Sequence, residues 1–152
     1  MNGKRILLIV TGGIAAYKTP ELVRLLTKAG ARVRCVLTEA GARFVTPLTL
    51  AALSGETVHT DLFSLTDETE MGHIELARDA DAVLVAPATA NTLAKMAHGL
   101  ADDLAGAVLL ATGRPVLAAP AMNVRMWTHP ATRDNVALLS RRGVVFIGPD
   151  SG

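Results

Sequence analysis

One stretch near the N-terminus sets the architecture of the whole chain: Arg5-Ile6-Leu7-Leu8-Ile9-Val10-Thr11-Gly12-Gly13. Its apolar run is continuous and does not alternate with polar residues, which is typical of a parallel strand buried on both faces. The glycine pair then turns the chain, and residues 17–28 predict a helix that stops at Gly30. A strand, a tight turn and a helix in this order indicate an α/β protein.

The same unit recurs along the rest of the chain. Strands are predicted at 33–37, 82–86, 115–119 and 144–147, and a short strand at Val58. Helices are predicted at 90–98, 102–110 and 131–142, with shorter helical pieces within 44–53 and 73–78. A polar mobile loop is predicted at 61–72, and a turn that starts at Pro87. Regular alternation of strands and helices predicts a doubly wound, mostly parallel, Rossmann-like sheet with right-handed crossovers.

Composition narrows the class of protein. The 152 residues suit one domain, and 50% hydrophobic against 19% charged residues predicts that apolar surface is buried between subunits. A net charge of +1 gives no reason to expect nucleic acid or an anionic membrane as partner, and no run is long enough to span a bilayer. The single cysteine, Cys35, excludes an intrachain disulfide and favours a cytoplasmic location, and its mid-strand position favours a buried, unreactive thiol.

The unusual residues of the chain all follow predicted strands. They are Thr11-Gly12-Gly13, Thr38, the segment 87–92 and the segment 120–127. In an open α/β sheet, ligands bind just beyond the carboxyl ends of the strands. Since these four segments would meet at one edge of the sheet, the sequence predicts a ligand site there.

The turn after the first strand suits a phosphate. Glycines at Gly12 and Gly13, followed by Ile14, allow backbone N–H groups to approach an anion. The spacing is not the G-x-G-x-x-G dinucleotide fingerprint, which disfavours NAD. Thr38, at the end of the second strand, carries a hydroxyl that suits a phosphate better than a ribose.

The segment Pro87-Ala88-Thr89-Ala90-Asn91-Thr92 has two interpretations. Thr89 could simply cap the following helix. Alternatively, Ala88 and Ala90 leave room for a flat ring while Thr89, Asn91 and Thr92 bind a mononucleotide. A mononucleotide with one phosphate and a flat ring, such as FMN, fits this set.

The segment Pro120-Ala121-Met122-Asn123-Val124-Arg125-Met126-Trp127 also has two interpretations. Met122 could cover a flat apolar ligand, and the Asn123 amide could hold a carboxylate. Alternatively, Asn123 caps a helix, and Met126 and Trp127 belong to the core.

His73 opens a predicted helix and could act as a base, although a lone histidine is often structural. The other histidines have no spacing typical of metal ligands, and the chain has no cysteine pair. No metal site is therefore predicted.

Two of these segments match the motifs of a known family. Residues 87–92 resemble its P-A-S-A-N-T motif, with Thr89 in place of serine, and residues 120–127 resemble its P-x-M-N-x-x-M-W motif; His73 resembles its active-site histidine. The chain thus resembles the homo-oligomeric flavin-containing cysteine decarboxylases. Residues 12–22 are similar to the phosphopantothenoylcysteine decarboxylase branch of that family.

The resemblance implies an enzyme, a carboxy-lyase that carries out FMN-dependent oxidative decarboxylation of 4′-phospho-N-pantothenoylcysteine to 4′-phosphopantetheine in coenzyme A biosynthesis. It implies that His73 is the base or charge partner and that Asn123 holds the substrate carboxylate. It implies homo-oligomers built of trimers, as a dodecamer. The residues expected to bind FMN are Gly12, Gly13, Ile14, Thr38, Ala88, Thr89, Asn91, Thr92 and Met122.

Three other functions stay open on the residues: a decarboxylase of peptide carboxyl-terminal cysteines, a flavin prenyltransferase of related fold, and a non-enzymatic, flavin-binding regulatory subunit. The family continues beyond Gly152 into a flap with a proton-donating cysteine, and bacterial members can carry a ligase domain after it. Residues 1–152 are therefore expected to form the FMN-binding decarboxylase domain, without that flap and impaired in turnover on its own.

Overall fold

The structure, a computed structural model, describes residues 1–60 and 74–149. Within these residues a five-stranded sheet has the order β2-β1-β3-β4-β5, and every neighbouring pair is parallel. The strands are β1 Arg5–Val10, β2 Arg32–Leu37, β3 Ala82–Ala88, β4 Val116–Pro120 and β5 Val145–Phe146. The predicted parallel α/β sheet is confirmed.

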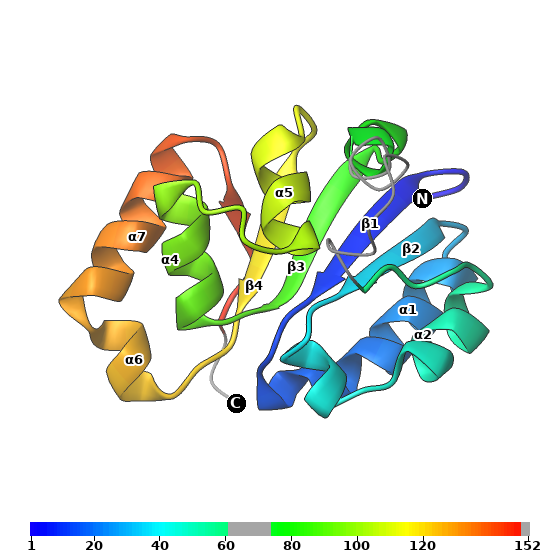
Figure 1. Ribbon diagram of the computed structural model, residues 1–152, viewed down its shortest axis with the longest axis horizontal. Helices are drawn as coiled ribbons and strands as arrows, with labels where there is room; N and C mark the ends of the chain where they lie inside the picture. Colours follow the sequence, from blue (N-terminus) through cyan, green and yellow to red (C-terminus); the bar gives the residue numbers. More distant parts are fainter. Residues whose placement is uncertain (61–73, 150–152) are drawn as a thin grey trace.

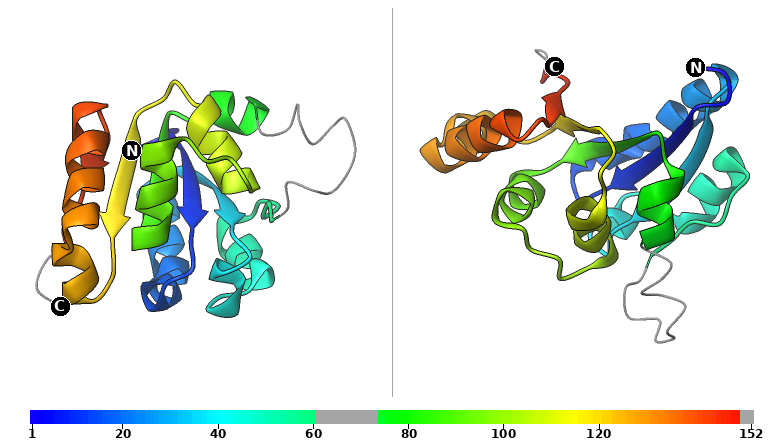
Figure 2. Two further views of the ribbon diagram at one scale, coloured as in Figure 1. Left: turned by 60° about the vertical axis from the view of Figure 1, so that its left-hand side comes forward. Right: turned by 90° about the horizontal axis from the view of Figure 1, so that it is seen from above.

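Helices cover the sheet in two layers (Figures 1 and 2). The helical segments are η1 Ile14–Lys18, α1 Thr19–Lys28, η2 Gly41–Arg43, α2 Pro47–Ser54, α4 Ala90–His98, α5 Leu104–Ala111, α6 Val124–Thr128, α7 Pro130–Arg141, and residues 74–79. One face of the sheet packs against η1, α1 and α2, and the other packs against 74–79, α4, α5 and α7. Among the described residues, no helix combines the length and apolar character needed to cross a membrane.

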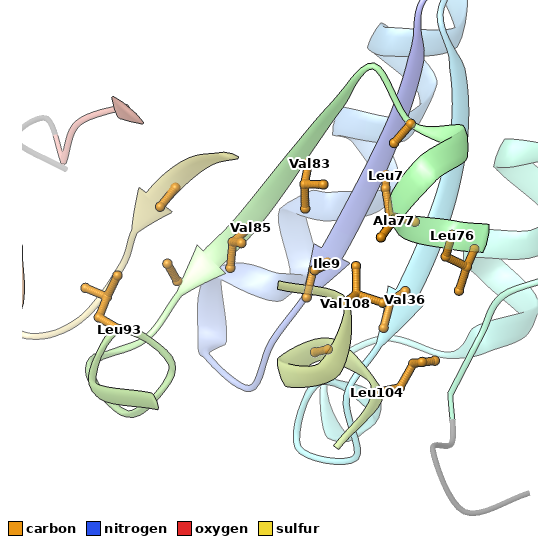
Figure 3. Packing of buried hydrophobic residues seen from close by; sticks show 14 of the residues in the cluster. Leu7, Ile9, Val36, Leu76, Ala77, Val83, Val85, Leu93, Leu104 and Val108 are labelled. Carbon is orange, nitrogen blue, oxygen red and sulfur yellow. The ribbon is translucent and has the colours of Figure 1, made fainter. Parts of the chain in front are cut away.

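Two hydrophobic clusters hold these layers together. In β1, Leu7 and Ile9 belong to the cluster beneath α4 and α5, whereas Leu8 and Val10 belong to the cluster beneath α1 and α2. All four are 0–1% exposed. Because successive side chains of a strand point to opposite faces, a strand covered on both sides has to be apolar at every position. Figure 3 shows the first cluster, with the labelled residues converging between sheet and helices.

The strand order places a topological switch point between β1 and β3. From β1 the chain crosses to β2 on one side, and β3 then lies on the other side of β1. Adjacent connections leave the sheet in opposite directions at such a point, so a crevice opens beyond the strand ends. The Thr11 hydroxyl donates a hydrogen bond to the Pro87 carbonyl and joins the ends of β1 and β3. The Ala121 N–H donates to the Ala88 carbonyl at 3.1 Å and joins the ends of β3 and β4.

The end of β3 differs from the expectation. Pro87 does not begin a turn but lies inside β3, which continues to Ala88. The β3–β4 register is irregular between Val85 and Ala88, and a proline is tolerated at such a site because the regular ladder is interrupted there. The irregularity also turns Ala88 to the same face as Val85, beneath α4 and α5.

Smaller differences occur at other elements. Helix α5 begins at Leu104 rather than at 102, since the Asp103 carboxylate accepts from the Gly106 N–H and acts as N-cap. Val58 is not in a strand; its neighbour His59 makes only an isolated bridge to Val36. The expected mobile loop at 61–72 lies outside the described residues.

Candidate functional site

A cavity of about 1600 Å³ opens at the carboxyl edge of the sheet and extends between α4 and α5. Its wall collects the segments that follow β1, β2, β3 and β4, as the sequence predicted. The predicted site residues in this wall are Gly12, Gly13, Ile14, Thr38, Thr89, Asn91, Thr92, Met122 and Asn123. The volume exceeds what a drug-sized ligand occupies, so a cofactor and a substrate can share it.

Among the described residues, one predicted site residue, Ala88, is not in this wall. Ala88 is fully buried in the core cluster beneath α4 and α5, because the irregularity in β3 turns its side chain inward. Neither Ala88 nor Ala90 lines the cavity, and the expectation that their small side chains leave room for a flat ring stays a prediction. His73 lies outside the described residues, so its role stays a prediction.

The turns after β1, β2 and β3 touch one another closely. A Cβ on Gly12 would lie 2.3 Å from the Ala40 Cβ, and a Cβ on Gly13 would lie 3.2 Å from the Thr89 Cγ2. A separation below 3 Å is a steric overlap, so Gly12 has to lack a side chain for the turns to meet. Because neither glycine carries a side chain, a ligand can approach the backbone of this turn closely, which is what an anion site requires.

The hydroxyls beside this turn cap local structure and still offer donors. The Thr38 Oγ1 accepts from the Gly41 N–H at 3.0 Å. The Thr89 Oγ1 accepts from the Thr92 N–H at 3.2 Å and donates to the Thr92 Oγ1 at 3.0 Å. The capping interpretation of Thr89 is therefore confirmed. Because a hydroxyl has both a donor and acceptor sites, Thr38 and Thr92 can each still donate to a ligand.

Asn123 is the N-cap of α6, and its side chain Oδ1 accepts from the Met126 N–H at 2.9 Å. The helix-cap interpretation is thus confirmed for Asn123. The prediction that Met126 and Trp127 belong to the core is wrong. Met126 is 43% exposed, and α6 has no buried residue. The cap engages only the oxygen of the amide. The NH2 group stays available as a double donor in the cavity wall, so capping and carboxylate binding are compatible.

Sequence reasoning missed Arg43 and Arg133. Arg43 lines the cavity near Thr38, and among the described residues it makes no ion pair; Glu39 is the acid nearest in sequence in the same wall. A basic residue five positions after Thr38 was the available signal. Arg133, on α7, stacks on Trp127 with its Cζ 3.8 Å from the ring centroid. No sequence pattern pointed to that pair.

Neither Cys35 nor His59 lines the cavity. Cys35 is buried in β2, and burial raises the pKa of its thiol to about 12, which keeps it protonated and unreactive. Burial, followed by the charge of Arg34, lowers the pKa of His59. Within 1–60 and 74–149, no group of three or more potential metal ligands occurs.

Comparison with known proteins bears directly on this site. Residues 1–152 match the family described as Flavoprotein. This chain belongs to the Flavoprotein family. It is 53% identical over 152 residues to the coenzyme A biosynthesis bifunctional protein CoaBC of Haemophilus influenzae, and 52% identical to that of Escherichia coli. The alignments cover 100% of this chain but only 38% and 37% of those proteins.

Solved structures agree with this assignment. A PPC decarboxylase variant complexed with pantothenoylaminoethenethiol superposes with a TM-score of 0.83 at 35% identity, covering 98% of this chain and 84% of the other. The FMN-dependent cysteine decarboxylase SpaF gives 0.88 at 34% identity, with 98% and 86% covered. The FMN-binding protein AtHal3 gives 0.82 at 33% identity, with 99% and 83% covered. The resemblance to flavin-containing cysteine decarboxylases is confirmed.

Proposed function

We propose that this chain binds FMN in the cavity at the carboxyl edge and carries out the oxidative decarboxylation of 4′-phospho-N-pantothenoylcysteine to 4′-phosphopantetheine, a step of coenzyme A biosynthesis. One observation supports this most strongly. One wall of the cavity contains the Gly12–Gly13 turn, the hydroxyls of Thr38 and Thr92, and the Asn123 amide. All 152 residues of this chain align with CoaBC proteins at 52–53% identity.

The residues present fit FMN. Its phosphate would lie over the Gly12–Gly13 turn, within reach of the Thr38 hydroxyl and the Arg43 guanidinium, and Met122 would contact its ring. A dinucleotide would need a second phosphate site, and the sequence lacks that fingerprint. Bound FMN would supply two-electron oxidation and reduction, while the chain supplies binding, orientation and protons.

The substrate end of the site would depend on Asn123. Its NH2 group donates hydrogen bonds, and a carboxylate accepts them, so the amide would orient the cysteine carboxylate. With its Oδ1 held by the Met126 N–H, the amide cannot flip to present its oxygen to the substrate. This fixed orientation favours an anionic group over a neutral donor.

His73 would act as the base or charge partner, and His73→Asn tests this. FMN should stay bound, while reduction of the flavin by substrate should slow by about 100- to 10,000-fold, as for loss of a general acid–base group. The rate is followed by flavin absorbance after anaerobic mixing. Bleaching at the wild-type rate would assign His73 a structural role.

The proposal includes assembly as trimers into a dodecamer, with residues 1–152 as the FMN-binding decarboxylase domain, in the cytoplasm. Large apolar side chains are exposed on η1 and α6: Ile14 at 77%, Tyr17 at 62% and Val124 at 75%. Exposed apolar surface of this kind suits burial against another copy. Light scattering of the FMN-loaded protein tests the assembly, and a monomer that retains FMN would contradict it.

Two measurements test the function itself. Chromatography of the cofactor released on denaturation should give FMN, and stoichiometric FAD or NAD would contradict the proposal. Carbon dioxide release is then compared between 4′-phospho-N-pantothenoylcysteine and a peptide ending in cysteine. The phosphorylated substrate should be preferred. Preference for the peptide would favour the peptidyl-cysteine decarboxylase alternative, and FMN binding without turnover of either would favour a regulatory subunit.

A further inference from the structure

Helix α6 carries Asn123 but has little to hold it in place. It is only five residues long, and none of its side chains is buried. Isolated helices of that length are not stable in water, so contacts with other elements have to fix its position. Its own N-cap and the Thr128 hydroxyl, which donates to the Val124 carbonyl at 2.9 Å, tie the helix only to itself.

Among the described residues, the side-chain hydrogen bond that joins α7 to α6 comes from Arg133. The Arg133 Nε–H donates to the Trp127 carbonyl at 2.9 Å, and the same guanidinium stacks on the Trp127 ring at 3.8 Å. A guanidinium can do both at once because its N–H groups lie in its plane while its face covers the ring. Arg133 thus holds the last turn of α6 by its backbone and by its largest side chain.

Helix α7 is itself anchored to the body of the protein. Leu139 is 3% exposed in the core cluster, and Thr132 is buried as well. The Arg142 Nη1 donates to the Ala97 carbonyl at 2.8 Å and connects the end of α7 to α4. The His129 Nδ1 accepts from the Ala131 N–H at 3.0 Å and fixes the corner between α6 and α7. A continuous path therefore runs from the core through α7 and Arg133 to α6.

We propose that Arg133 is a positioning residue for substrate binding, which it serves by clamping Trp127 so that the Asn123 NH2 group is held toward the substrate carboxylate. This inference rests on the proposed function. Trp127 belongs to the P-x-M-N-x-x-M-W motif, and in this proposal it is the other half of the clamp and does not contact the substrate. Loss of the clamp should loosen the segment from Asn123 onward while leaving the FMN side of the cavity unchanged.

Trp127 reports on the clamp directly, because it is the only tryptophan of the chain. Acrylamide quenching of its fluorescence is measured on the FMN-loaded chain for wild type, Arg133→Gln and Arg133→Lys. The matched control is Arg24→Gln, which removes an exposed arginine paired with Glu21 on α1. Quenching should increase in Arg133→Gln and less in Arg133→Lys, which keeps a charge but cannot stack and donate together. Wild-type quenching in Arg133→Gln would overturn the clamp.

Substrate binding is measured on the same proteins by anaerobic flavin reduction at increasing 4′-phospho-N-pantothenoylcysteine. In Arg133→Gln the half-saturating concentration should rise about three- to tenfold, with the limiting rate and the FMN affinity unchanged. A lower limiting rate and melting temperature with unchanged half-saturation would show a structural role only and overturn the proposal. If wild-type protein binds FMN but is never reduced by substrate, the proposed function fails by itself, and the quenching data still decide whether Arg133 clamps α6.

Discussion

The two walls of the cavity are built by different physical means. On one side, the turns after β1, β2 and β3 meet in van der Waals contact, with no space for a Cβ between Gly12 and Ala40. On the other side, the segment after β4 is held by an amide cap, a hydroxyl and a stacked arginine, and α6 buries no side chain. The first wall is fixed by packing and the second by polar contacts.

This difference separates two functions of the site. Close packing tolerates no added atom, since protein interiors are nearly incompressible. A wall held by exposed polar contacts can change one residue at little cost to the fold, because such contacts contribute little to overall stability. Substitutions in the first wall should therefore affect cofactor binding, and substitutions in α6 and its Asn123 cap should affect substrate binding without changing FMN affinity.

The largest effect is expected for Asn123→Asp. Aspartate is as good an N-cap as asparagine, so α6 and the melting temperature should not change. The substitution replaces an NH2 donor by a carboxylate that repels the substrate carboxylate, and flavin reduction by substrate should slow at least about 100-fold while FMN stays bound.

Asn123→Ala serves as its control, since it removes both the cap and the donor and should also cost about 0.5–2 kcal/mol of stability. Near-normal reduction of the flavin in Asn123→Asp would mean that Asn123 is a helix cap and nothing more.

The next effect concerns the packed wall. Gly12→Ala places a Cβ 2.3 Å from the Ala40 Cβ and should weaken FMN binding by about 10- to 100-fold, the consequence of overpacking by ~1–3 kcal/mol. Gly113→Ala is a matched control, because Gly113 also lines the cavity but a Cβ there meets nothing within 4 Å. Isothermal titration of the apoproteins with FMN measures both. Equal affinities in the two variants would argue against contact between the turns.

The smallest effect is expected for Arg43→Gln. The substitution removes an exposed arginine proposed to face the FMN phosphate, so FMN affinity should fall about three- to tenfold. Riboflavin affinity should not change, because riboflavin has no phosphate. Arg125→Gln, on α6 and outside the cavity lining, should change neither affinity. If Arg43→Gln instead raised the half-saturating substrate concentration without changing FMN affinity, the phosphate that Arg43 binds would be that of the substrate.

Much of this arrangement could be predicted from the sequence. The unbroken apolar run in β1 specifies a strand buried on both faces, and Gly12 and Gly13 specify a tight turn after it. The location of the site follows, because the carboxyl ends of parallel strands share one edge. Asn123 and Thr89 could be given two roles each from their chemistry, and both take the capping role. Asn123 keeps its NH2 group as a donor, whereas the Thr89 hydroxyl donates to the Thr92 Oγ1.

The remaining features depend on contacts between distant residues. The inward orientation of Ala88 results from an irregular register against β4, which local sequence does not encode. The Arg133–Trp127 pair depends on the angle between two short helices. Arg43 lines the cavity because η2 packs against the end of β1. A Cβ on Gly41 of η2 would be 2.7 Å from the Val10 carbonyl oxygen.

The central claim is that one cavity holds FMN against the packed wall and a cysteine carboxylate against the Asn123 wall. Anaerobic mixing of the FMN-loaded protein with 4′-phospho-N-pantothenoylcysteine tests it most directly, with flavin absorbance and carbon dioxide followed together. The account predicts a fall of the oxidised flavin band within the first turnover and release of carbon dioxide in the wild type, and neither in Asn123→Asp. A flavin that stays oxidised in the wild type at saturating substrate would contradict it.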